Sequence, residues 1–198
     1  GLLAFAGYIY WHNQNVAAAE KQSEAFVAAV DLLKSGDQTG ARKALAKVAN
    51  AEQPGYRAMA QLLAANLDGE QGKAAEAIKT YAKVAGDASL PQVFRDLALV
   101  RQTSAEFDSL PPQKVIDRLK DLAKPGNPWF GSAGELTAIS YMKLGKENLA
   151  GPIFAQIAKQ EDVPETLRSR AQQMAGSLGV DAVQLNEKPT GASAQADA

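Results

Sequence analysis

An internal repeat is the feature that most constrains the fold of this chain. The segments that begin at Gly36 and Gly72 align residue for residue, and a third copy begins at Gly145. In each copy an alanine stands five residues after the glycine, large apolar residues stand nine and twelve after it, and another alanine stands thirteen after it. These positions share one face of an α-helix. A fourth, degenerate copy starts near Leu110 and has Val115 in place of the first alanine.

Each of these amphipathic helices is preceded by a second one. Before Gly36, apolar residues recur with helical spacing at Phe26, Ala29, Val30 and Leu33. Glycine or proline separates the predicted helices, and no segment alternates with the period of a β-strand over a useful length. The sequence therefore predicts an all-α fold, an α-solenoid of about four helical hairpins in which each hairpin buries its apolar face against its neighbours.

The end of the repeat region is predicted to be a single helix over residues 164–178, whose polar side chains suit a cap on the stack. We expect the repeat domain to span residues 16–179. Residues 180–198 contain no aromatic residue and no sustained apolar face. We therefore expect this tail to be disordered, and its deletion to leave stability almost unchanged.

The first eleven residues are uncharged and apolar, and end in aromatic residues. Tyr8, Tyr10 and Trp11 stand where the apolar run meets polar residues, as aromatic rings do at a membrane interface. An 11-residue helix covers only about half of the ~30 Å hydrocarbon core. Residues 1–15 are interpreted as the C-terminal part of a transmembrane anchor that begins before Gly1. The alternatives are a signal peptide that is cleaved near the alanines at 17–19 and an ordinary buried helix.

Composition excludes several classes of function. The chain has 21 Lys and Arg against 22 Asp and Glu, so it offers no basic field for nucleic acid. It has no Cys and one His, which removes sulfur-based zinc sites and most histidine-based catalysis. His12 is assigned no role, because no titrating partner is evident. We expect that the protein is not an enzyme and that it uses no cofactor, metal or small-molecule substrate.

The repeat resembles the tetratricopeptide repeat, a helix pair of ~34 residues with small and large apolar positions in fixed order. The alanine of the second helix and the large residue after it are matched in three copies by Ala41 and Leu45, Ala77 and Tyr81, and Ala150 and Phe154. The resemblance implies a tetratricopeptide-like solenoid. Proteins with such repeats present a surface to other proteins.

A closer resemblance covers nearly the whole chain. It depends on Tyr-Ile-Tyr-Trp at residues 8–11, Phe-Arg-Asp-Leu-Ala at 94–98 and Pro-Gly-Asn-Pro-Trp at 125–129. These segments resemble the bacterial tetratricopeptide-like family of the ancillary SecYEG translocon subunit. The resemblance implies a single-pass inner-membrane protein whose repeats face the periplasm and contact translocon subunits and periplasmic chaperones. It implies no catalytic residue.

The first helices of the hairpins are expected to line the concave surface of the array, where Asn66, Arg95 and Arg101 would face a protein or peptide partner. Two functions remain open. A membrane-tethered scaffold would bind a defined folded partner, whereas a holdase-like periplasmic chaperone would bind many unfolded secreted or outer-membrane clients. A regulatory enzyme is disfavoured by the residue inventory.

Overall fold

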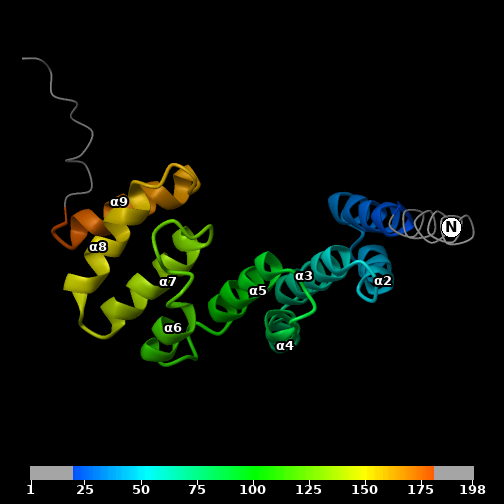
Figure 1. Cartoon of the computed structure of the whole chain (residues 1–198), viewed down its shortest axis with the longest axis horizontal. Coiled ribbons are helices and arrows are strands. Elements are labelled where there is room, and N and C mark those ends of the chain that lie inside the picture. Colours follow the sequence, from blue (N-terminus) through cyan, green and yellow to red (C-terminus); the bar gives the residue numbers. More distant parts are fainter. Residues whose placement is uncertain (1–19, 181–198) are drawn as a thin grey trace, which may run out of the picture. The chain divides into compact units, whose positions relative to one another are not determined.

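The computed structural model describes residues 20–180, and this range is helical and contains no strand (Figure 1). The first described helix occupies residues 20–34. The helices that follow are α2 (Gln38–Val48), α3 (Pro54–Glu70), α4 (Ala74–Gly86), α5 (Gln92–Ala105), α6 (Pro112–Leu119), α7 (Phe130–Lys143), α8 (Glu147–Ala158) and α9 (Glu165–Ser177). The all-α prediction is confirmed.

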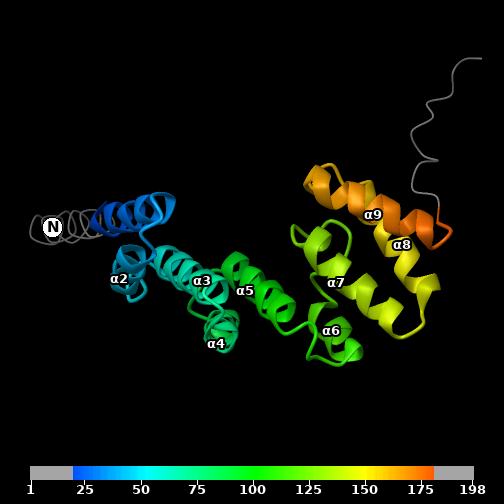
Figure 2. The same ribbon diagram turned by 180° about the vertical axis from the view of Figure 1, so that it is seen from behind.

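The helices form two compact units, which divide the chain between Asp108 and Ser109. In the first unit, α3 packs against α2 and α4, and α5 packs against α4 and more lightly against α3 (Figure 2). In the second unit, α7 packs against α6 and α8, and α9 packs against α8 and more lightly against α7. The same order of contacts thus recurs in α3–α4–α5 and in α7–α8–α9, as a stack of repeats requires. The two helices of the third expected hairpin, α5 and α6, belong to different units.

Burial confirms the repeat register that the sequence predicts. The alanine five residues into each regular copy is at most 2% exposed, and Val115 fills its place in the degenerate copy without exposure. The large residues at positions nine and twelve are buried in all four copies: Leu45, Val48, Tyr81, Val84, Leu119, Leu122, Phe154 and Ile157. One helical face therefore carries the core contacts throughout the array.

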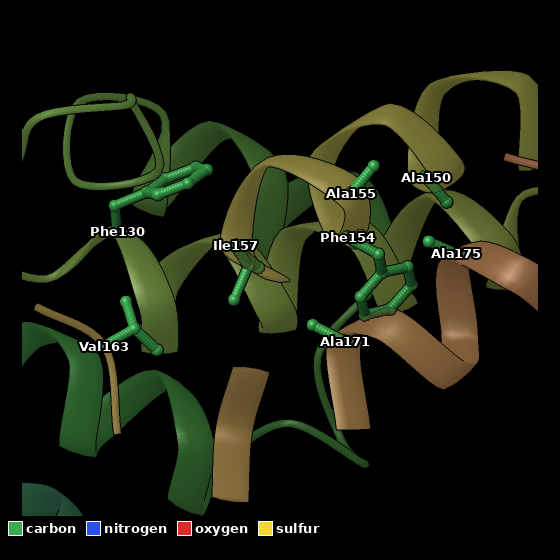
Figure 3. Packing of buried hydrophobic residues seen from close by; sticks show 9 residues of the cluster. Phe130, Ala150, Phe154, Ala155, Ile157, Val163, Ala171 and Ala175 are labelled. Carbon is green, nitrogen blue, oxygen red and sulfur yellow. The ribbon is translucent and has the colours of Figure 1, made fainter. Parts of the chain in front are cut away.

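The core of the second unit shows how these positions meet. Phe154 and Ile157 of α8 lie among Phe130 of α7 and the small residues Ala171 and Ala175 of α9 (Figure 3). Alanines on one helix opposite large residues on the next let the backbones approach closely while filling the space between them. This packing explains why the repeat alternates small and large apolar residues.

Four glycines end helices in the same way. Gly36, Gly72, Gly145 and Gly179 all have φ between 68° and 83°, the left-handed region that strains other residues. After each of them the next residue donates its backbone N–H to the carbonyl five positions earlier, which completes a Schellman motif. The helix α9 therefore ends with the same motif as the first helix of a repeat. The sequence after Gly179 lacks the second-helix pattern, so within the described residues the array closes on half a repeat.

One residue of the expected tail at 180–198 is described, Val180, and it packs against the array. The Val180 N–H donates to the Ala175 carbonyl at 2.9 Å. Its side chain fills a notch at Gly151 on α8, where an added Cβ would lie 2.6 Å from the Val180 Cγ2 atom. A single residue makes this contact, so it produces no periodic signal in the sequence. Residues 181–198 lie outside the described residues.

The structure describes nothing before residue 20, so the anchor interpretation for residues 1–15, with Tyr8, Tyr10 and Trp11, lies outside the described residues, as does His12. Between residues 20 and 180, no helix combines the length and apolar character that crossing a bilayer requires.

Candidate protein-interaction site

A cleft of about 230 Å³ opens on the first unit between the helix at residues 20–34, the start of α2 and the C-terminal half of α3. The residues that line it are Leu33, Gly36, Gln38, Leu63, Asn66, Leu67 and Glu70. Its lining thus combines three leucines with three polar side chains. Gly36 of the Schellman turn lines the cleft without a side chain, and the spacing of four between Leu63 and Leu67 puts both on one face of α3.

Two polar side chains of this cleft are held by hydrogen bonds: Gln38 accepts from the Gln71 Nε2 atom at 3.1 Å, and Asn66 accepts from Tyr81. The Tyr81 hydroxyl on α4 donates a hydrogen bond of 2.6 Å to the Asn66 Oδ1 atom. Tyr81 is only 6% exposed, because its ring occupies the large apolar position of the repeat. The bond uses the amide oxygen, and the Asn66 Nδ2 group has no hydrogen-bond partner within the described residues. Asn66 is therefore a fixed side chain with its donors unused.

Charged residues surround the Tyr81 hydroxyl. Burial raises the pKa of Tyr81 above 10.0, the nearby Arg101 guanidinium lowers it, and the carboxylates of Glu70 and Asp68 raise it. Asp68 is engaged by Arg42, whose Nη2 atom lies 2.8 Å from the Asp68 carboxylate. Glu70 and Arg101 are exposed, and neither forms an ion pair in the part of the chain that the structure describes. These two charges remain available to a ligand.

Arg95 has a structural role at the end of α4. Its Nε atom donates to the Ala85 carbonyl at 3.3 Å, and its Nη1 atom donates to Gln92 at 3.0 Å. Gln61 makes the corresponding bond one repeat earlier, donating its Nε2 atom to the Ala49 carbonyl at 3.0 Å. Ala49 and Ala85 occupy the same repeat position. The first helix of each of these repeats thus satisfies a carbonyl that the preceding helix end leaves unpaired.

The structure brings together two of the three residues predicted to face a partner. Asn66 and Arg101 both act on the Tyr81 hydroxyl, whereas Arg95 interacts with the end of α4. Partner binding by these residues stays a prediction. Sequence reasoning missed Tyr81 and Glu70. The available signal for Tyr81 was its hydroxyl, at a position where the other copies of the repeat hold leucine or phenylalanine.

The arrangement offers hydrogen-bond donors, apolar surface and single charges, which are the groups that bind protein segments. In the range from residue 20 to residue 180, no three His, Asp or Glu side chains are placed to hold a metal ion together.

A family model for the tetratricopeptide repeat-like domain matches residues 1–124. The chain belongs to this tetratricopeptide repeat-like family. The match covers the first unit and α6, and α8 beyond it keeps the buried positions of the repeat at Ala150, Phe154 and Ile157. Domains of this kind are typically non-catalytic modules that bind other proteins. Neither the curated proteins nor the solved structures contain a match to this chain.

Proposed function

We propose that this protein is a membrane-tethered protein-interaction scaffold, an accessory of the bacterial protein-export translocon that links it to periplasmic chaperones. The observation that carries the scaffold role is the cleft on the first unit, where Asn66 presents unused donors between leucine side chains. Such a surface can recognise a protein segment, and nothing in the cleft resembles a catalytic constellation.

The membrane tether is supported by the sequence before the described range. The uncharged segment that ends in Tyr-Ile-Tyr-Trp suits the outer end of a transmembrane helix. We propose that it places the protein in the inner membrane with a single pass and the repeats in the periplasm. Tethering raises the effective concentration of the repeats beside a membrane complex, so weak individual contacts suffice.

The translocon as partner is supported by the resemblance of residues 8–11, 94–98 and 125–129 to the family of the ancillary translocon subunit. The test is chemical crosslinking of the full-length protein in native membranes, followed by mass spectrometry. We expect crosslinks to translocon subunits and to periplasmic chaperones. A matched control replaces the apolar segment by a cleavable signal sequence, which releases the same repeats into the periplasm and should reduce the translocon crosslinks.

Two outcomes would contradict the proposal. Extraction of the native protein by carbonate without detergent would exclude the tether. Crosslinks that contain neither translocon subunits nor chaperones, in membranes that hold the protein, would exclude the accessory role.

A holdase-like chaperone is the second candidate. It is favoured by exposed apolar side chains on first helices of the first unit, since Val27 and Val93 are each 53% exposed. A holdase should suppress the aggregation of several unrelated unfolded proteins at stoichiometric ratio, whereas a scaffold should not. Light scattering of two unrelated aggregating clients, with and without the protein, separates the two functions.

A further inference from the structure

The size of the cleft beside Asn66 limits what it can hold. At about 230 Å³ it is smaller than the roughly 300–1,000 Å³ of pockets that enclose small molecules and cofactors. Leu33 and Leu63 are half-buried along its walls, and Leu67 is 3% exposed at its base. A space of this size and lining suits one apolar side chain with the backbone on either side of it.

The hydrogen-bonding capacity of the cleft matches a peptide backbone. The Tyr81 hydroxyl holds the Asn66 oxygen at 2.6 Å, so the amide nitrogen of Asn66 is already oriented before any ligand arrives. Its hydrogens need an acceptor, and the carbonyl of an extended segment supplies one. Because the side chain is held in place, binding loses little rotamer entropy there.

The charge of the cleft comes from Glu70. It is the one charged residue among those that line the cleft, and it forms no ion pair within the described residues. Asp68 close by pairs with Arg42 at 2.8 Å, and the Lys73 ammonium donates to the Gln71 Oε1 atom at 3.1 Å; neither cation lines the cleft. Arg101 acts on the Tyr81 hydroxyl but does not line the cleft. A cationic side chain is therefore favoured beside the bound apolar residue, and an anionic one is disfavoured.

We infer that this cleft binds an extended segment of a protein partner in which an apolar residue is followed by lysine or arginine. The apolar side chain lies between Leu33 and Leu63, its carbonyl accepts a hydrogen bond from the Asn66 Nδ2 atom, and the basic side chain pairs with Glu70. This inference rests on the proposed scaffold function, because it names the chemistry of the partner at the same site.

Two synthetic peptides test the charge preference: acetyl-Ser-Leu-Lys-Ser-amide and acetyl-Ser-Leu-Glu-Ser-amide. Each is titrated into the full 198-residue chain in detergent micelles, and the methyl signals of Leu33 and Leu63 and the side-chain amide signals of Asn66 are followed by NMR. The lysine peptide should shift these signals and bind about threefold to tenfold more tightly than the glutamate peptide, as expected for one exposed charge pair and its like-charge counterpart. The Glu70→Gln variant should bind the two peptides equally.

A paired substitution tests the hydrogen bond. Asn66→Leu combined with Tyr81→Phe removes the donor and the hydroxyl together, so that no buried hydroxyl is left unpaired. Both peptides should then bind roughly tenfold more weakly, while Asn148→Leu, an exposed asparagine on α8, should leave binding unchanged. If the paired variant fails to fold by circular dichroism, the Glu70→Gln comparison still decides the inference.

The outcomes separate this inference from the function on which it rests. Cleft signals that do not move, or a glutamate peptide that binds as tightly as the lysine peptide, would overturn the inference, even where crosslinks to the translocon persist. Peptide binding in the cleft without any crosslink to translocon or chaperone would support the inference and overturn the translocon role.

Discussion

Ala77 is the small residue at which α4 approaches α3. Its side chain is 2% exposed, and a Cβ added to Gly69 of α3 would lie 4.0 Å from the Ala77 Cβ atom. The backbones of α3 and α4 therefore approach each other closely at Gly69 and Ala77. Ala77→Leu adds three carbon atoms to a side chain that is only 2% exposed, so we expect the helices to separate or the leucine to adopt a strained rotamer.

The expected cost follows from the packing. Overpacking of this kind destabilises by about 1–3 kcal/mol. In a unit of this size, each kcal/mol lowers the melting temperature by about 4–8 °C. We therefore expect Ala77→Leu to lower the melting temperature by at least about 4 °C, measured by circular dichroism at the helical band and checked by urea denaturation.

The control uses the same substitution on the same helix. Ala82 is exposed, so Ala82→Leu carries the same change in helix propensity without the steric conflict and should stay within about 0.5 kcal/mol of wild type. Ala150→Leu in the second unit should behave like Ala77→Leu, because Ala150 is fully buried at the same repeat position. Equal melting temperatures for the Ala77 and Ala82 variants would refute the packing argument.

Three further predictions concern polar and terminal residues. Arg95→Ala should lower the free energy of unfolding by about 0.5–1.5 kcal/mol, because it removes the hydrogen bond to the Ala85 carbonyl at the end of α4. Arg101→Ala should lower it by less. Equal losses in urea denaturation would contradict the structural role of Arg95. Burial raises the pKa of Tyr81 above 10.0, so the unfolded chain loses this proton first as pH rises. Stability, measured by urea denaturation, should therefore fall more in wild type than in Tyr81→Phe as the pH rises above about 10. Val180→Ala should cost about 1 kcal/mol by thermal denaturation, because it removes two carbons from the notch on α8; an unchanged melting temperature would show that the contact contributes nothing.

The helical repeat could be predicted from the sequence because burial on a helix is periodic. The same spacing of small and large residues recurs after Gly36, Gly72 and Gly145, and even the degenerate copy keeps its buried face with Val115 in place of alanine. The glycines also carry a local signal, because a left-handed helix end depends on the residue itself and not on distant neighbours. The repeat register, the all-α fold class and the tetratricopeptide repeat-like family can therefore be predicted from the sequence alone.

The roles of individual polar residues were decided only by the tertiary structure. Arg95 and Arg101 stand six residues apart on α5, and the sequence treats them alike, yet one bonds the end of α4 and the other is exposed near Tyr81. Asn66 on α3 is held by the Tyr81 hydroxyl on α4. An apolar residue is decided in the same way, since Val180 packs against Gly151, which is distant from it in the sequence. A polar side chain takes its role from the atom that lies within about 3 Å of it, and that neighbour is set by how the helices stack.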